Sequence, residues 1–174
     1  MLFRSVHITD RVLKTLGINS QLSSFHDALV PRGMRRFNLG SAKTLGEPIP
    51  AGNGLFTARS LARMYAMIAG GGEIDGVRLL SEDTIDRLSR TEPAPGRHAV
   101  VPVDLRWRLG YHGVYSRRGF EPGAFGHFGV GGSGAWALPD LELAFALVTN
   151  GGARSPLMRL SGEVVDRARR LVSA

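Results

Sequence analysis

The order of the sequence patterns predicts an α+β fold. Residues 57–92 show helical periodicity, residues 103–150 are typical of antiparallel strands broken by glycines, and residues 155–172 suit an amphipathic helix. Helices followed by antiparallel strands and a packing helix are typical of a layered α+β domain and argue against a doubly wound sheet. The chain has 174 residues, 43% of them hydrophobic, which suits one globular domain.

We expect residues 1–56 to be an irregular segment with a short helix. Thr9 or Asp10 can cap that helix, and Gly17 can end it. Residues 18–54 lack periodicity, and an irregular connection of this length is uncommon inside a compact domain.

The first helix of the 57–92 segment is predicted to begin after Thr57 and to end at the three glycines that start with Gly70. Met64 and Tyr65 lie on its apolar face, and we place both in the core.

A small hairpin and a second helix follow in the same segment. Asp75-Gly76 suits a type I′ turn between two short strands. Ser81 can cap the second helix, whose apolar residues are Ile85 and Leu88.

The run over residues 124–150 predicts two or three adjoining strands. Its aromatic and apolar residues are interrupted only by glycines and by a Pro139-Asp140 turn. Residues 107–115 are also expected to be extended. Residues 143–148 are almost continuously apolar, which is typical of a strand buried on both faces.

The chain closes with an amphipathic helix that can pack on these strands. Ser155 caps it and Pro156 fills its first position. Its apolar stripe comprises Leu157, Leu160, Val164, Ala168 and Leu171.

Two glycine-rich motifs lack the context that their chemistry needs. Gly129, Gly131 and Gly134 fit G-x-G-x-x-G, and Ser133 lies in a partial G-x-S-x-G. Both motifs require a helix directly after them. A turn and a strand are predicted instead, so we interpret Ser133 as an ordinary strand residue.

Composition excludes several kinds of chemistry. The chain has no cysteine, which excludes disulfides and thiolate sites, and its five histidines form no metal-binding motif, so we expect no cofactor. No apolar run has the length of a membrane span and no signal-peptide core is present, so we expect a cytoplasmic protein without a membrane partner. The net charge of +7 comes from arginines spread along the chain, which does not favour nucleic-acid binding.

Several ordered segments over residues 45–172 resemble the C-terminal part of the serine β-lactamase-like superfamily. They are PAGNGLFTARSLARMYAMIAGGGEIDGVRLLSEDTIDRL, WRLGYHGVY, FGHFGVGGSGAWALPDLELAFALVTN and the closing helix. That superfamily includes class C β-lactamases, penicillin-binding DD-peptidases and family VIII carboxylesterases. The resemblance implies the C-terminal half of the β-lactamase/DD-peptidase fold, so that residues 1–174 form a single, partial domain.

The resemblance also implies roles for residues around His127. The family uses an S-x-x-K serine and lysine, a tyrosine motif, and a Lys/His-x-Gly motif on a strand at the edge of the site. His127-Phe128-Gly129 matches the last motif, so His127 would orient substrate or tune the proton network. The Val130 N–H would be one of two oxyanion donors. Asn150 matches a position near the substrate, although turn chemistry favours the alternative of an Asn150-Gly151 turn.

The sequence departs from the family at the other two motifs. No serine is followed by a lysine three residues on, and Ser41-Ala42-Lys43 is the nearest approach. Tyr65, Tyr111 and Tyr115 do not begin a Y-x-N or Y-x-S arrangement. We therefore expect the back half of a larger serine hydrolase, produced as a fragment, a split gene or a shortened reading frame, and inactive by itself.

Three functions remain open. The first is the C-terminal portion of a serine β-lactamase-like hydrolase, acting on an acyl ester or amide when an N-terminal half complements it. The second is a non-catalytic binding or assembly module of the same fold, and the third is a nucleic-acid-associated protein. In the family an N-terminal strand would pair beside residues 142–149, so we expect that strand to be an open edge that promotes homo-oligomers, aggregation or complementation.

Overall fold

The computed structural model describes residues 11–17, 38, 40–50, 52, 54–90, 105–116, 118–129, 132–150 and 157–173. The chain divides into two compact units. The first comprises Met1–Leu55 with Ala94–Asp104, and the second comprises Phe56–Pro93 with Leu105–Ala174.

The described part of the first unit contains two short helical turns. Residues 11–15 are helical, and Gly17 follows with a φ of 75°, so the predicted short helix and its glycine stop are confirmed. The predicted caps Thr9 and Asp10 lie outside the described residues. The second turn is α3 (Ala42–Leu45), which begins after Ser41, whose Oγ accepts a hydrogen bond from the Thr44 N–H.

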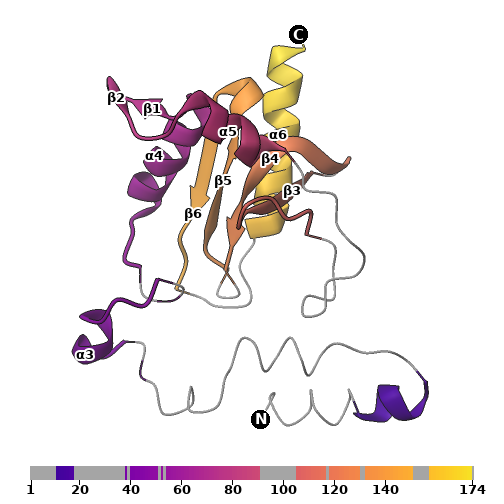
Figure 1. Ribbon diagram of the computed structural model, residues 1–174. Coiled ribbons are helices and arrows are strands. Elements are labelled where there is room, and N and C mark those ends of the chain that lie inside the picture. The colour runs from indigo at the N-terminus through magenta and orange to yellow at the C-terminus, as the bar shows by residue number, and fades with distance from the viewer. Residues whose placement is uncertain are drawn as a thin grey trace. The chain divides into compact units, whose positions relative to one another are not determined.

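The second unit is built around a four-stranded antiparallel sheet with the strand order β3-β4-β5-β6 (Figure 1). Its elements, in chain order, are α4 (Ala58–Ala69), β1 (Glu73–Ile74), β2 (Val77–Arg78), α5 (Glu82–Ser89), β3 (His112–Ser116), β4 (Gly119–Phe128), β5 (Gly134–Leu138), the 3-10 helix η2 (Pro139–Leu141), β6 (Leu143–Leu147) and α6 (Leu157–Val172). The mixture of helices and antiparallel strands confirms the predicted α+β class.

The ends of α4 follow the predicted signals. Thr57 caps the helix in a reciprocal pair with Ser60, and Gly70 ends it. Tyr65 is buried as predicted, but the placement of Met64 in the core is wrong, since Met64 is 42% exposed. Met67, one turn further along α4, is buried instead, and its carbonyl oxygen accepts the Gly72 N–H in the turn that leads to β1.

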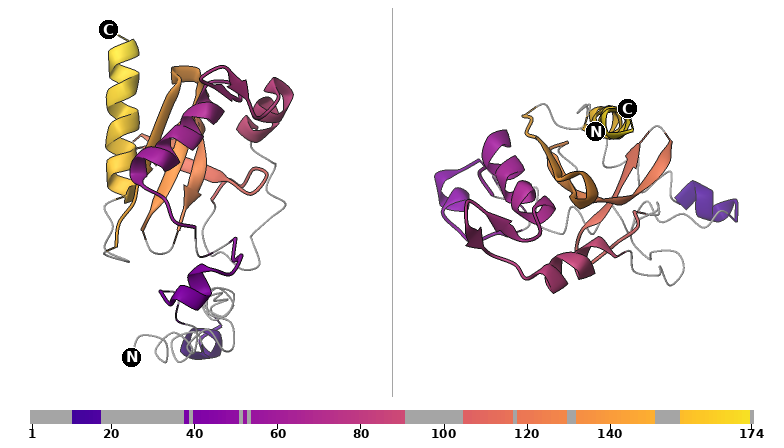
Figure 2. Two further views of the ribbon diagram at one scale, coloured as in Figure 1. Left: turned by 90° about the vertical axis from the view of Figure 1, so that its left-hand side faces the viewer. Right: turned by 90° about the horizontal axis from the view of Figure 1, so that it is seen from above.

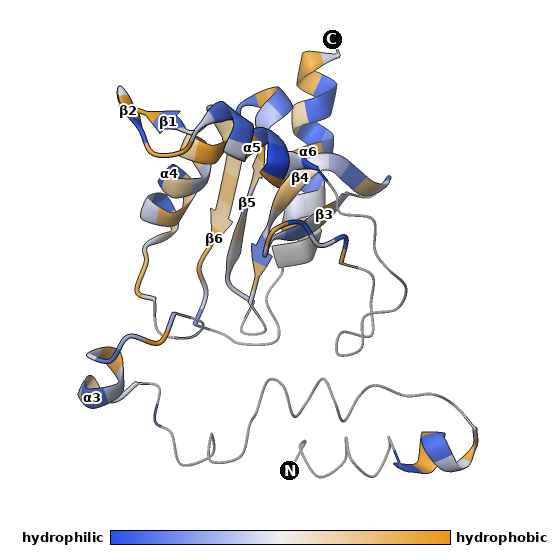
Figure 3. Ribbon diagram, viewed as in Figure 1, coloured by the Kyte–Doolittle hydropathy of each residue, from blue (hydrophilic) through white to orange (hydrophobic). Residues whose placement is uncertain are grey.

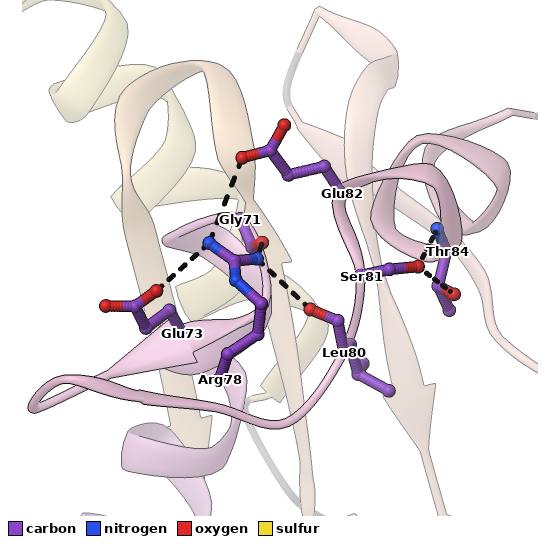
Figure 4. A network of polar contacts seen from close by, with 7 residues as sticks. All are labelled: Gly71, Glu73, Arg78, Leu80, Ser81, Glu82 and Thr84. Carbon is purple, nitrogen blue, oxygen red and sulfur yellow. Dashed lines mark hydrogen bonds and ion pairs between the residues drawn. The ribbon is translucent and has the colours of Figure 1, made fainter.

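The predicted hairpin after α4 is confirmed. Asp75 and Gly76 both have positive φ, at 51° and 75°, as a type I′ turn requires. Arg78 ties the hairpin to its surroundings, because its guanidinium donates to the carbonyl oxygens of Gly71 and Leu80 and pairs with Glu73 at 3.0 Å (Figure 4).

The predicted cap and core residues of α5 are also confirmed. Ser81 Oγ accepts from the Thr84 N–H, and Ile85 and Leu88 are buried.

Helices cover both faces of the sheet. Figure 2 shows α6 on the opposite side of the sheet from α4. One core cluster joins α4 and α5 to one face, and a second joins α6 to the other. The α4 cluster includes Tyr65, Ile68, Ile85, Phe125 and Ala137, and the α6 cluster includes Val114, Trp136, Leu138 and Val165.

Strand β6 packs on both faces of the sheet, but all its residues are only half-buried, so the predicted burial on both faces holds in part. Ala144 and Ala146 pack against the α4 cluster, whereas Leu143 and Phe145 pack against the α6 cluster. Figure 3 shows the strand as apolar along its length. Among the described residues, β6 pairs with β5 alone and is therefore an outermost strand of the sheet.

The extended segment predicted over residues 107–115 begins later than expected. Arg108 and Tyr111 face each other across an isolated bridge, and the chain turns between them at Leu109 and Gly110, which both have positive φ. Regular pairing starts only at His112. Residues 107–111 therefore form a tight turn instead of a strand.

The C-terminal helix buries a face that differs in part from the predicted stripe. Val165 is fully buried, but Leu171 is 81% exposed, so its assignment to the buried stripe is wrong. Small residues let α6 approach the sheet closely: a Cβ added at Gly162 would lie 3.3 Å from the Tyr115 carbonyl oxygen. Packing therefore centres on Ser161, Gly162 and Val165. Ser155 and Pro156 lie outside the described residues.

Within the described part of the chain, no helix combines the length and apolar character that a membrane span needs.

Candidate functional site

The end of β4, the start of β5 and the end of β6 lie next to one another and form one edge of the sheet, the edge across the strands and not the one along β6. Gly134, the first residue of β5, is paired with Phe128 at the end of β4 and with Leu147 at the end of β6. His127 and Gly129 at the end of β4 and Asn150 after β6 therefore belong to the same edge. Figure 1 shows this edge at the lower ends of β4, β5 and β6. The structure thus brings together three residues that the sequence selected from two separate segments.

His127 presents its side chain at the end of β4. The residue is exposed, and its backbone is paired with Ala135 of β5. Directly after it, the Gly129 N–H donates to the Ser133 carbonyl at 2.8 Å and the Gly132 N–H donates to the Gly129 carbonyl at 2.9 Å. These two bonds close the β4–β5 hairpin. Val130, the predicted oxyanion donor, lies outside the described residues.

A second histidine supports the strand end from inside the protein. His112 is only 4% exposed; its Nε2 accepts the Phe128 N–H at 2.9 Å, and its Nδ1 donates to the Gly113 carbonyl at 3.0 Å. These partners require the neutral ring with its proton on Nδ1. Burial, reinforced by the nearby His127, lowers the pKa of His112, although the bond to Gly113 acts in the opposite direction.

Aromatic rings enclose His112. Its ring centre lies 4.8 Å from that of Phe128 and 5.7 Å from that of Trp107, both in edge-on geometry, and 5.3 Å from that of His127. The buried and the exposed histidine are thus neighbours, and only the exposed one can meet a ligand from solvent.

Tyr65 of α4 approaches the same strand from the helical layer. Its hydroxyl shares a hydrogen bond with the His127 backbone, and its ring meets that of Tyr111 edge-on at 6.1 Å between centres. Burial, and then the neighbouring Tyr111, raise the pKa of Tyr65 well above its ordinary value. Tyr65 is therefore protonated at neutral pH and is unsuited to act as a tyrosinate base, in agreement with the absence of a tyrosine motif around it.

Ser133 has a structural role at this edge. Its Oγ accepts from the Thr149 N–H at 3.0 Å and donates to the Thr149 carbonyl at 3.2 Å. The side chain thereby extends the β5–β6 pairing by one position. β5 begins at the next residue, Gly134, where a nucleophile elbow would need a helix. Ser133 itself directly precedes the strand and does not belong to it, so the rejection of the elbow is confirmed and the assignment to the strand is one residue off. Asn150 comes directly after Thr149 and is exposed, and its substrate role stays a prediction.

The glycines of the G-x-G-x-x-G match are explained by packing. A Cβ at Gly134 would lie 2.6 Å from the His127 carbonyl oxygen, so no larger residue fits between the strands there. Gly132 has a φ of 84°, which favours glycine in the hairpin loop. The motif connects two strands, as expected, and lacks the helix that a dinucleotide site requires.

Sequence reasoning selected His127 and missed both residues that hold it. His112 and Tyr65 reach the strand only through the register of β3 with β4 and the packing of α4. The available signal was weak: a histidine inside a predicted extended segment that has few other polar residues.

Comparison with known proteins identifies the family. The Beta-lactamase family model matches residues 5–168. The chain belongs to the β-lactamase family. The predicted resemblance to the serine β-lactamase-like superfamily is therefore confirmed.

Two relatives of this β-lactamase-family chain support the assignment. The esterase/β-lactamase LipL of Mycobacterium tuberculosis (strain ATCC 25618 / H37Rv) is 50% identical over 113 residues, which cover 64% of this chain and 25% of LipL. The crystal structure of a novel penicillin-binding protein homolog from Caulobacter crescentus is 30% identical with a TM-score of 0.55, and the match covers 64% of this chain and 32% of that one. The β-lactamase-family chain thus spans about a quarter of the one relative and a third of the other.

Proposed function

We propose that this chain forms the strand-side wall of a serine β-lactamase-like acyl-hydrolase site. The observation that carries the proposal is His127: an exposed histidine of a His-x-Gly motif, at the end of a sheet strand, in a chain of the β-lactamase family. The reaction would be ester or amide hydrolysis through an acyl-serine.

Each residue at this edge would have a distinct role. His127 would orient the substrate or tune the proton network, and the Val130 N–H would donate to the oxygen that becomes negative in the tetrahedral intermediate. Gly129 leaves the backbone accessible to the acyl group, and Asn150 would contact the substrate from the end of β6.

The nucleophile would come from outside the printed sequence. No serine in it has a lysine three residues on, and Ser133 is already engaged by the backbone of Thr149. The proposal is therefore that this chain contributes binding and electrostatic groups, and does not turn over substrate by itself.

A two-part experiment tests this proposal. In the first part, the chain alone is incubated with a short-chain nitrophenyl ester and a fluorophosphonate probe; we expect neither turnover nor labelling, and either one would overturn the claim that its nucleophile is absent. In the second part, the chain replaces the matched segment of LipL, and ester hydrolysis by the chimera is measured.

We expect the chimera to hydrolyse the ester and His127→Ala to lower its kcat/KM by about 100-fold, a typical loss for a proton-transfer group. Glu142→Gln, an exposed position at the opposite edge of the sheet, is the matched control and should leave kcat/KM unchanged. A folded chimera in which His127→Ala behaves like Glu142→Gln would contradict the role of His127.

We propose a second candidate function, an assembly module that pairs through β6. The supporting observation is that β6 ends the described sheet and carries apolar residues on both faces. A strand in this position offers backbone donors and acceptors to another strand, either from a second copy or from a complementing hydrolase segment.

A further inference from the structure

The end of β4 is held by a side chain at a point where the sheet ladder has stopped. His112 pairs with Gly126 in the last described pair of the β3–β4 ladder. An uninterrupted ladder would next pair Phe128 with Gly110, but the chain turns there, and Gly110 has a φ of 88°. His112 Nε2 accepts the Phe128 N–H in place of a ladder carbonyl. One imidazole nitrogen thus extends the hydrogen bonding of β4 toward β3 two residues past the last ladder pair.

Only one protonation state of His112 can do this. The neutral ring with its proton on Nδ1 gives Gly113 a donor and Phe128 an acceptor. Protonation would place a second N–H on Nε2, directly opposite the Phe128 N–H. Two donors facing each other in a buried site would break the contact.

The groups around His112 favour its neutral form. His127 of β4 lies against the ring, and a charge on it would oppose a second positive charge. Tyr111 directly precedes His112, and Tyr65 of α4 contacts the His127 backbone. Burial raises the pKa of both tyrosines, so both are uncharged at neutral pH. Trp107 and Phe128 complete the surroundings with apolar rings. Of the neighbours named here, none carries the negative charge that would stabilise an imidazolium.

We propose that His112 is a positioning residue that sets the end of β4, and that it holds the His127-Phe128-Gly129 segment in place only while its ring is neutral. For its catalytic meaning the inference rests on the proposed function. The geometric reason is direct: Phe128 lies between His127 and Gly129, so fixing its N–H fixes the direction of the strand on both sides. Acidification releases the segment by removing the acceptor.

The test measures hydrogen exchange of the Phe128 amide by NMR on the ¹⁵N-labelled chain, as a protection factor that corrects for intrinsic exchange. His112→Phe keeps an aromatic ring and removes the acceptor; we expect protection of Phe128 to fall by about 10-fold, the worth of one such hydrogen bond. His112→Gln supplies a carbonyl oxygen at a similar reach and should restore most of the protection. The Trp136 amide in the centre of the sheet reports that the fold is intact.

A second test needs no substitution: the protection factor of the Phe128 amide is measured in the unmodified chain over a series of pH values. Protection of Phe128 should fall with the titration of His112, followed through its own ring ¹⁵N signals, which should show the Nδ1–H form at neutral pH. His127→Ala is the matched control, because it removes the neighbouring histidine, and the pH dependence should persist in it.

Unchanged protection of Phe128 in folded His112→Phe would overturn the proposal, as would protection in the unmodified chain that does not follow the His112 titration. If His112→Phe does not fold, the pH series decides alone. These readouts require no substrate, so they stand or fall separately from the proposed function. In an active LipL chimera, His112→Phe should lower kcat with little change in KM, and His112→Gln should restore kcat.

Discussion

The guanidinium of Arg169 on α6 lies 2.5 Å from the carboxylate of Glu121 on β4. The same guanidinium lies 2.6 Å from the Asp140 carboxylate in η2. The hydrogen bond to Glu121, more than any other contact, holds the pKa of Arg169 above its ordinary value. One side chain therefore connects the last turns of α6 to two separate parts of the sheet layer.

Replacing Arg169 should weaken this connection. The Glu121 side chain is only 13% exposed, so Arg169→Met leaves a poorly solvated carboxylate without its partner. We expect the free energy of unfolding to fall by about 1–2 kcal/mol, measured by urea denaturation. Arg170→Met, which changes the exposed neighbour, is the control and should alter stability by less than about 0.5 kcal/mol. Equal losses for the two variants would contradict this account.

The pH dependence of stability should contain a contribution from His112. Burial lowers its pKa in the folded protein, so over the range just below the ordinary histidine value the unfolded chain binds more protons than the folded one. The resulting stabilisation is fully present above about pH 6.5 and is lost as pH falls below it. In urea denaturation between about pH 7 and pH 5, His112→Gln should show a shallower loss of stability than the unmodified chain. Parallel curves would exclude this contribution.

The two glycines that flank the β4–β5 loop should tolerate alanine differently. At Gly134 an added Cβ meets the His127 carbonyl at 2.6 Å, whereas at Gly129 the nearest atom is the Ser133 carbonyl at 3.5 Å. Gly134→Ala should therefore destabilise the protein by about 2–3 kcal/mol through overpacking. Gly129→Ala should remain within about 1 kcal/mol. Thermal denaturation of both variants checks the order, and a reversed order would refute it.

Strand β6 should govern association in solution. Val148 is 42% exposed and directly follows β6, an outermost strand of the described sheet. Val148→Lys places a charge beside that strand, and charges along an outermost strand oppose pairing with another strand. We expect the unmodified chain to associate and Val148→Lys to shift it toward monomer in size-exclusion chromatography with light scattering. Val172→Lys, at a 71% exposed position on α6, is the control. A monomeric unmodified chain at high concentration would count against the assembly role.

Features set by a few neighbouring residues were predictable from the sequence. Thr57 and Ser81 cap helices, and Asp75-Gly76 makes its turn, because each needs only local hydrogen bonds or a local backbone preference. Met64 was misplaced because helical spacing shows which residues share a face of α4 but not which of them the neighbouring elements cover. Similarly, Leu171 continues the periodic stripe of α6 but is exposed in the folded chain.

In the candidate site, too, local features were predictable from the sequence and long-range contacts were not. His127 and Gly129 could be selected because their motif is contiguous in the sequence. His112 could not, because its contact with Phe128 spans 16 residues and exists only after β3 and β4 pair. Motif residues can thus be found by their order in the chain, whereas the residues that hold them require the sheet register.

The bonds between Ser133 and Thr149 also bear on how reliably β6 finds its place. The strand reads Leu-Ala-Phe-Ala-Leu, so sliding it by two residues against β5 would keep alanines on one face and large side chains on the other. Hydrophobic pattern alone therefore discriminates poorly between the correct alignment and a shifted one. Ser133 Oγ engages both the N–H and the carbonyl of Thr149, and only the native alignment brings these groups together. These two hydrogen bonds therefore favour the native register of β6 against β5 over one shifted by two residues.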